Sequence, residues 1–311
     1  MNTSPDTTSQ DLESRLIGAG LCAASAFGFA TLSILAKLAY AEGLSMNGFL
    51  SLRFGSAAVL LLVILGIRQG RAIFPKPRLL LALFLLGALG YFTQSTMYFL
   101  GLQRISASLA SVLLYIYPAF VALTVWAVEG RRPAAPEWLA MVLAFVGVAL
   151  TAGPLGGFKD GAPDPAGVLL ILVGAFLYGV YIVVSNRFVH RTSPLISTAW
   201  IALGASMSFG LSGWLTDSWV FTFTPRSIAL LAALVVLSTI IPIAAFFAGM
   251  RRVGPTAASL LSTLEPVFTI LLAAVILHEA LTRNQWAGGA LILIAVVLLN
   301  LPTRRIQGQA A

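Results

Sequence analysis

Long apolar runs follow one another along almost the whole chain, and they restrict the folds available to it. Of the 311 residues, 59% are hydrophobic and 10% are charged, whereas soluble domains carry about 25% charged residues. A helix needs about 20 mostly apolar residues to cross a bilayer. A water-soluble fold is therefore excluded, and the sequence predicts an all-α integral membrane protein. Ten transmembrane helices are expected, at residues 16–40, 48–67, 79–100, 107–128, 137–153, 166–186, 195–214, 227–249, 257–277 and 286–301.

The basic residues gather in alternate connections between these spans. Cytoplasmic loops of membrane proteins hold an excess of Lys and Arg, and most of the 19 Lys and Arg residues become cytoplasmic if the N-terminus is inside. We therefore expect a multi-pass protein of a bacterial-type inner membrane, with a cytoplasmic N-terminal tail (1–15) and a cytoplasmic C-terminal tail (302–311). The net charge of +8 follows from this topology and does not indicate a nucleic-acid partner. Binding of anionic lipid by the basic loops is compatible with the same topology.

A segment in the middle of the chain recurs near its end. Residues 101–126 align without a gap on residues 249–274, and the register pairs Pro118 with Pro266. The chain therefore consists of two related halves with five expected spans in each.

The two halves are predicted to be inverted relative to each other. Residues 16–153 form the first repeat and residues 166–301 the second. Because each repeat has an odd number of spans, the second enters the membrane from the opposite side. Inverted repeats place a substrate cavity at their interface near the middle of the membrane. This symmetry is typical of transporters, and an inverted-repeat channel is the alternative.

The aligned segments resemble the EamA-type repeats of the drug/metabolite transporter superfamily. The resemblance rests on the runs from Gly101 and from Gly249, each followed by an acidic residue and a tryptophan: Glu129 and Trp138, then Glu279 and Trp286. It covers essentially the whole chain. It implies ten helices in two inverted five-helix repeats around a central cavity formed by the first four helices of each half. The segment Tyr115-Ile116-Tyr117-Pro118 is similar to one in YddG-like amino-acid exporters, which implies amino-acid transport.

Polar and aromatic side chains recur on one face of several expected spans. Such side chains are costly in hydrocarbon unless they face the bundle interior or a wet cavity. Their helical spacing favours a cavity of hydroxyls, one amide and aromatic rings, suited to a zwitterion or a small amphiphile. Helix packing is the alternative for each Ser and Thr. The candidate cavity residues are Gln94, Ser95, Tyr98, Ser111, Tyr115, Tyr117, Tyr178, Tyr181, Ser262 and Glu265.

Three prolines, Pro118, Pro242 and Pro266, fall inside expected spans. Each removes a helical hydrogen bond and frees a carbonyl, and freed carbonyls in broken helices bind substrates in transporters. The equivalent positions of Pro118 and Pro266 favour a hinge or a kink that shapes the cavity over a packing kink. For Pro242 both interpretations stay open.

Few charges lie within the spans. Glu265 is the only acid well inside one, which makes it a candidate proton carrier; the alternative is a structural bond to a backbone amide or an arginine. Lys37 and Arg53 lie near the outer ends of their spans, and we expect them to extend to the membrane interface.

The motifs of membrane enzymes and ATP-driven pumps are absent. The sequence has no HExxH motif, no intramembrane aspartate pair and no P-loop, and Cys22 is its single cysteine. His190 and His278 lie in loops without other ligand types, so we expect neither metal nor cofactor. These observations favour a secondary transporter that exports amino acids or related small metabolites across the lipid bilayer by alternating access. The alternatives are a multidrug or other metabolite carrier of the same fold, or a channel or membrane scaffold.

Overall fold

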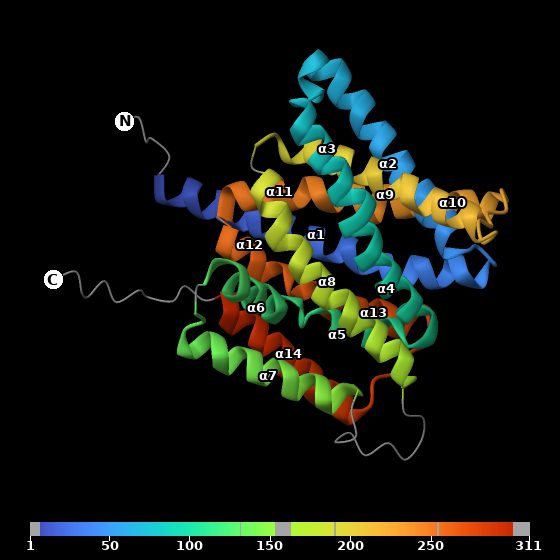
Figure 1. The fold of residues 1–311 in the computed structure, drawn as a ribbon. Helices are drawn as coiled ribbons and strands as arrows, with labels where there is room; N and C mark the ends of the chain where they lie inside the picture. Colours follow the sequence, from blue (N-terminus) through green and yellow to red (C-terminus); the bar gives the residue numbers. More distant parts are fainter. Residues whose placement is uncertain (1–6, 131, 153–162, 190, 254, 301–311) are drawn as a thin grey trace.

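The computed structural model describes residues 7–130, 132–152, 163–189, 191–253 and 255–300. The expected tail at 302–311, residues 1–6 of the other tail, His190 and the last residue expected in each repeat lie outside this part of the chain. All regular secondary structure in the described residues is helical (Figure 1). In chain order the elements are α1 (Thr7–Ala41), α2 (Met46–Gln69), η1 (Gly70–Ile73), α3 (Pro77–Leu85), η2 (Leu86–Tyr91), α4 (Phe92–Arg104), α5 (Ala107–Leu114), α6 (Tyr117–Glu129), α7 (Ala135–Ala152), α8 (Pro165–Val189), α9 (Pro194–Leu215), α10 (Pro225–Val235), η4 (Val236–Ile240), α11 (Ile241–Val253), α12 (Pro255–Ser262), α13 (Leu264–Ile276) and α14 (Arg283–Asn300).

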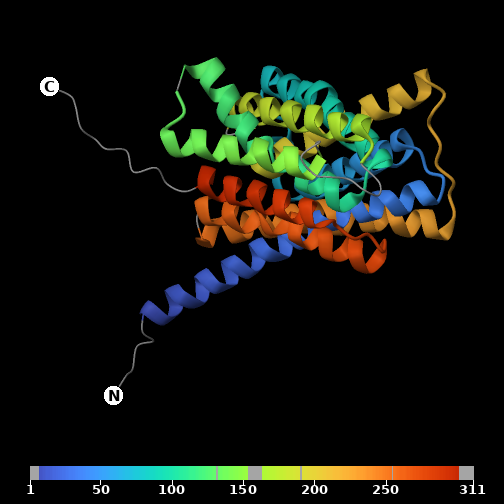
Figure 2. The same ribbon diagram turned by 90° about the horizontal axis from the view of Figure 1, so that it is seen from below.

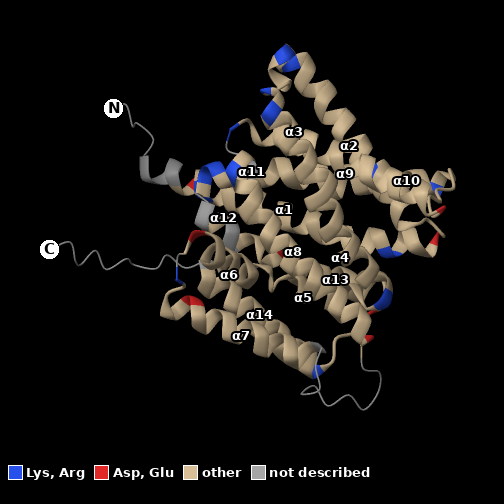
Figure 3. Ribbon diagram, in the orientation of Figure 1, with Lys and Arg blue, Asp and Glu red and all other residues tan. Residues whose placement is uncertain are grey.

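Seven helical segments in the described residues are long and apolar enough to cross a membrane. Three further expected spans coincide with shorter apolar helices, Ala135–Thr151, Leu264–Ile276 and Arg283–Leu299. The prediction of an all-helical, multi-pass membrane protein is therefore confirmed. The number of ten crossings stays a prediction. Most Lys and Arg residues lie where helices end, and the middles of the helices carry few charges (Figure 3).

Two kinds of helix irregularity occur once in each half. The fourth expected span is interrupted between α5 and α6 at Tyr115 and Ile116, and the ninth between α12 and α13 at Thr263. Pro118 and Pro266 stand in the first turns of α6 and α13, where a missing N–H costs least. The third and eighth spans instead contain π-helices, η2 and η4, which overlap in the aligned register.

Equivalent helices of the two halves pack against each other. α7 lies along α14 in both views (Figure 1 and Figure 2). A Cβ atom at Gly147 would come within 2.8 Å of Ile292, and one at Gly288 within 2.6 Å of Thr151. Residues further along α7 therefore meet residues earlier in α14, so the two helices run antiparallel.

The pair α2 and α9 has the same arrangement. Gly55 approaches Ser206, whereas Asn47, two turns earlier in α2, approaches Gly213 later in α9. The absent side chains of Gly55 and Gly213 let the helix backbones come close, as is common between membrane helices. These two helices are also antiparallel.

A further pair of contacts between the halves is reciprocal. α1 packs on α11, and its counterpart α8 packs on α4. A Cβ atom at Gly18 would lie 2.6 Å from the Cβ of Arg252, and one at Gly167 would lie 2.8 Å from the Cβ of Arg104. Because Arg104 and Arg252 are equivalent in the aligned register, the same glycine contact is built twice.

Candidate functional site

A cavity of about 400 Å³ lies between the two halves. Helices from both halves line it: α1, η2, α4, α5 and α6 from the first, and α8, α9, α11, α12 and α13 from the second. Eight of the candidate cavity residues are among its walls, namely Gln94, Ser95, Tyr98, Tyr115, Tyr117, Tyr178, Ser262 and Glu265. The structure therefore brings together most of the side chains that the sequence singled out.

Two candidate cavity residues lie elsewhere. Ser111 is buried in α5 and donates to the carbonyl of Ser108 at 2.9 Å. Tyr181 belongs to the wall of an apolar hollow between η2 and α8, where its ring fits against Gly90. Leu89, which shares this hollow, is exposed, so the hollow faces outward and is distinct from the central cavity.

Hydrogen bonds between the interrupted fourth and ninth spans form one wall of the cavity. The Tyr115 hydroxyl lies 2.7 Å from the carbonyl oxygen of Ser262, to which it donates, and 2.9 Å from Oε2 of Glu265. Ser262 is four residues before Pro266, so its carbonyl has no helical N–H donor. The tyrosine of the first half therefore satisfies a carbonyl that the proline of the second half leaves free.

A run of aromatic rings continues this wall. The rings of Tyr115 and Tyr117 are 5.9 Å apart, and those of Tyr117 and Tyr178 are 4.8 Å apart, both edge to face. Among the described residues the hydroxyls of Tyr117 and Tyr178 have no hydrogen-bond partner. The wall therefore offers apolar ring surface together with hydroxyls that are free to bind a solute.

The part of the cavity wall that α1 forms contains residues that the sequence analysis did not single out. Phe29, Leu32 and Ser33 of α1 line the cavity, and the hydroxyls of Ser33 and Tyr98 are hydrogen bonded at 2.7 Å. Gln94 donates to the Ser95 hydroxyl at 2.9 Å. The signal for Ser33 was a hydroxyl within a long apolar span, which alone does not distinguish a cavity from packing.

Arg53 contradicts the expectation that it extends to the interface. Its side chain is only 3% exposed and reaches across to η4. There Nε donates to the Thr239 hydroxyl at 3.0 Å and Nη2 to the Ser238 carbonyl at 3.3 Å. Ser238 is four residues before Pro242, which has no N–H to donate to that carbonyl. The two acceptors on η4 hold the guanidinium inside the protein.

Polar contacts join helices at one end of the molecule, and those of Glu279 join the two halves. Backbone N–H groups of Ala107 and Ser108 donate to the Glu279 carboxylate at 2.9 and 3.0 Å, which caps the first turn of α5. Lys37 donates to the carbonyl of Ile105 at 2.7 Å. Glu279, one of the two acids in the family resemblance, therefore has a structural role outside the cavity.

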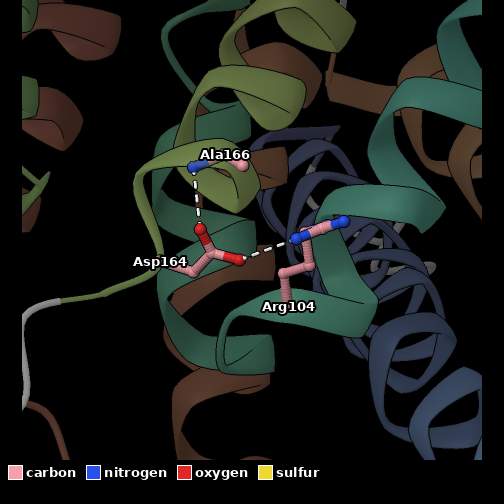
Figure 4. Close-up of polar contacts among 3 residues, drawn as sticks. All are labelled: Arg104, Asp164 and Ala166. Atoms are coloured by element: carbon pink, nitrogen blue, oxygen red, sulfur yellow. Dashed lines mark hydrogen bonds and ion pairs between the residues drawn. The ribbon is translucent and has the colours of Figure 1, made fainter.

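An ion pair joins α4 to the start of α8 at the same end (Figure 4). Nη1 of Arg104 donates to Asp164 at 3.0 Å, and the N–H of Ala166 donates to the other carboxylate oxygen at 2.9 Å. Arg104 and the backbone N–H groups hold the pKa of the Asp164 carboxyl below its ordinary value. In the described residues, no cluster of three or more His, Cys, Asp or Glu side chains is arranged to hold a metal ion.

Comparison with known proteins identifies two copies of one family pattern. Residues 16–153 and 165–301 each match the EamA-like transporter family. An uncharacterized transporter of Archaeoglobus fulgidus is 27% identical over 281 residues, which are 88% of this chain and 93% of that protein. The uncharacterized transporter YwfM of Bacillus subtilis is 27% identical over 184 residues, 58% of this chain and 60% of YwfM. The aromatic amino acid exporter YddG of Salmonella typhimurium is 26% identical over 200 residues, 61% of this chain and 66% of YddG.

A solved crystal structure has a similar fold. The match has a TM-score of 0.61 and 20% sequence identity, and it covers 92% of this chain and 99% of the other. This likeness concerns the fold alone, whereas the family pattern occurs twice and covers nearly the whole sequence. The chain belongs to the EamA-like transporter family, within the drug/metabolite transporter superfamily.

Proposed function

We propose that the protein is a secondary transporter that exports amino acids or related small metabolites by alternating access. The observation that carries this proposal is the cavity between the halves, whose wall combines the rings and free hydroxyls of Tyr117 and Tyr178 with the carboxyl of Glu265. Rings bind an apolar side chain, and hydroxyls and a carboxyl bind the polar end of a zwitterion. The YddG relative supports amino acids as the substrate class.

The proposal includes ten membrane crossings in two inverted repeats, residues 16–153 and 166–301. The antiparallel packing of α7 on α14 and of α2 on α9 supports inversion, because equivalent helices then point in opposite directions. The start of α1 and the end of α14 lie on the same side of the molecule in both views (Figure 1 and Figure 2), which fits an even number of crossings. The location is an inner membrane, with both termini in the cytoplasm.

Within this proposal the substrate contacts are the eight candidate residues that line the cavity. Pro118 and Pro266 act as hinges where the fourth and ninth spans break. Pro242 frees the acceptor that binds Arg53 and is a positioning residue. Ser111 and Tyr181 take no part, because neither reaches the cavity.

Counterflow in proteoliposomes tests the function. Purified protein is reconstituted, and uptake of each labelled amino acid is measured with and without the same unlabelled amino acid inside. A carrier accelerates uptake when the inside is loaded, a pore conducts without acceleration, and a scaffold moves nothing. Absence of counterflow for the whole amino-acid panel would overturn amino-acid export.

A matched pair of variants tests the cavity in the same assay. Gln94→Ala removes the amide that faces the cavity and is expected to reduce counterflow by about tenfold, the effect of losing one hydrogen bond to a charged group. Gln69→Ala changes an exposed amide at the end of α2 and is expected to have no effect. Equal activity of the two variants at equal expression would remove Gln94 from the substrate site.

Cysteine labelling on intact cells tests the topology. Cys22 is fully buried and serves as the unlabelled background. Gln103→Cys and Arg251→Cys occupy equivalent places next to Arg104 and Arg252. A membrane-impermeant maleimide is expected to label only the first. Labelling of both sites contradicts the inversion, and labelling of only the second reverses the orientation of the chain.

A second candidate function is export of organic cations, including drugs. Glu265 favours it, because a carboxyl among aromatic rings also suits an amphiphilic cation. Competition in the counterflow assay distinguishes the two candidates. Inhibition by hydrophobic quaternary amines, without inhibition by any amino acid, would favour the drug carrier.

A further inference from the structure

Arg53 is a buried cation without a counter-ion. It lies seven residues into α2, about 10 Å from the start of the helix at 1.5 Å per residue, and 3% of it is exposed. An arginine guanidinium carries its positive charge in proteins. None of the described carboxylates lies within ion-pair distance of it. A charge in this position is costly unless it is paired, and membrane proteins keep such charges for function.

The hydrogen-bond capacity of Arg53 is only partly used. The guanidinium has five N–H donors, and its two acceptors, the Thr239 hydroxyl and the Ser238 carbonyl, are neutral. In the part of the chain that the structure describes, the buried Nη1 has no hydrogen-bond partner. Two of its nitrogen atoms, Nε and Nη2, are thus held by hydrogen bonds, whereas Nη1 remains available to an acceptor.

Arg53 stands one layer of side chains behind the cavity wall. Its guanidinium lies over the ring of Phe54, 4.9 Å from the centroid, and Phe54 packs edge to face on Tyr91 at 5.3 Å. Tyr91 lines the cavity. On the other side of η4, the hydroxyls of Ser238 and Thr31 are hydrogen bonded at 2.8 Å, next to the cavity residue Leu32.

The equivalent position in the other half holds no arginine. Counted from the equivalent N-cap residues Ser45 and Ser193, Ile201 of α9 corresponds to Arg53 of α2. Ile201 contacts the other π-helix, η2, through its backbone. The corresponding junction of the second half therefore forms without any cation.

We infer that Arg53 is the binding group for the carboxylate of the transported solute, which reaches Nη1 when Tyr91 moves aside. This inference rests on the proposed function and specifies its substrate class: solutes that carry a carboxylate next to an apolar or aromatic side chain. The planar fork of arginine matches a carboxylate in two parallel hydrogen bonds. Glu265 and the tyrosine hydroxyls then remain for the amino group.

The test compares ligands that differ in the carboxylate. Binding of L-phenylalanine, 3-phenylpropionate and 2-phenylethylamine to the purified full-length protein in nanodiscs is measured by titration calorimetry. Arg53→Gln is expected to weaken binding of phenylalanine and phenylpropionate by about 10- to 100-fold, as for a lost hydrogen bond between charged groups. Binding of phenylethylamine, which has no carboxylate, is expected to change by less than about twofold.

Arg68→Gln, on the same helix but near its other end, is the matched control and leaves all three affinities unchanged. Equal weakening of acid and amine by Arg53→Gln would overturn the inference, because Arg53 would then act through the fold. Failure of the wild-type protein to bind either carboxylate would overturn it as well.

If Arg53→Gln does not fold, Arg53→Lys takes its place. Lysine keeps the charge but not the fork, so the ratio of acid to amine affinity must still fall, and an unchanged ratio overturns the inference. The proposed function fails separately, by absence of counterflow in the wild-type protein. Carboxylate binding that depends on Arg53 can persist without transport, so the two failures are distinguishable.

Discussion

Two equivalent junctions between the halves are built with different chemistry. In one, α9 meets the π-helix η2, and a Cβ atom at Gly87 would collide with the backbone of Ile201. In the other, α2 meets the π-helix η4 through the side chain of Arg53, which bonds to Ser238 and Thr239. The backbone irregularity is shared, whereas the residues that fill it are not. At the first, which we call the glycine junction, the helix backbones are in direct contact. The second, which we call the arginine junction, introduces a charge beside the cavity.

The interrupted fourth and ninth spans also carry different side chains at equivalent positions. Tyr117 of the first half and Glu265 of the second stand at equivalent positions, each one residue before a proline. Both line the cavity. A symmetric scaffold therefore presents a phenol from one side and a carboxyl from the other. A solute with unlike ends fits such a site better than a symmetric one, because each end meets a different group.

The glycine junction gives the largest expected effect. Gly87→Ala places a methyl group against the Ile201 backbone, which cannot rotate away as a side chain does. We expect a loss of about 3 kcal/mol of stability, the upper part of the range for overpacked sites, seen as a lower melting temperature in detergent. Gly20→Ala is the control, because nothing lies within 4 Å of that Cβ position. It should melt at the same temperature as the wild type or higher.

The next largest loss of stability is expected at the arginine junction. Thr239→Val removes the hydroxyl that accepts from Nε of Arg53 and donates to the Leu234 carbonyl at 2.9 Å. A further buried donor is then unpaired, and we expect a loss of about 2 kcal/mol. Thr239→Ser keeps the hydroxyl and should retain most of the stability. If both variants melt alike, the bond to Arg53 does not stabilise the junction.

The sequence predicted the helices and the repeat better than the irregular turns. Apolar length marked every span, and the gapless register placed Pro118 and Pro266 at equivalent breaks. Neither π-helix contains a proline, and the close packing of Gly87 on α9 is a tertiary contact without a local sequence signal. Inversion follows from counting crossings and stays a prediction.

Candidate residues on a continuous helix face lie together at the cavity, whereas helical spacing is a poorer guide near a break. Ser111 shares helical spacing with Tyr115, but α5 ends at Leu114, so the face does not continue across the interruption. Tyr181 follows Tyr178 by one turn, yet its ring fits against Gly90 on the outer side. The position of Arg53 along its span predicted that its side chain would be exposed at the membrane interface, whereas it is buried. The acceptors that hold it arise only when η4 and α2 come together.

The two tyrosines beside the break in the fourth span are expected to have different roles, Tyr115 in stability and Tyr117 in binding. Tyr115→Phe leaves the Ser262 carbonyl without its donor and is expected to cost about 1 kcal/mol of stability. Tyr117→Phe removes a hydroxyl without a partner in the described residues, so stability should not change. Its effect is expected on transport, as an increase of about fivefold in KM, the value of one neutral hydrogen bond. A drop in melting temperature for Tyr117→Phe alone would reverse these two roles.

The smallest effect is expected at the ion pair between Arg104 and Asp164, which extends the comparison of the halves. Arg104 pairs with Asp164, whereas the equivalent Arg252 donates to the Ala248 carbonyl of its own helix. Asp164→Asn removes the charge but keeps an oxygen for the Ala166 N–H, since Asn caps a helix as well as Asp does. The pair is exposed, so a small loss of melting temperature at neutral pH is expected, and salt should reduce it.

The pH dependence of that loss identifies its cause. Because the pKa of Asp164 is lowered in the folded protein, its stabilising contribution is present above the ordinary pKa of an aspartate and disappears as the pH falls through the lowered value. The difference in melting temperature between wild type and Asp164→Asn should therefore vanish in acid. Arg104→Gln should behave like Asp164→Asn at neutral pH. A difference that persists unchanged in acid would mean that the charge of Asp164 is not what joins α4 to α8 at this end.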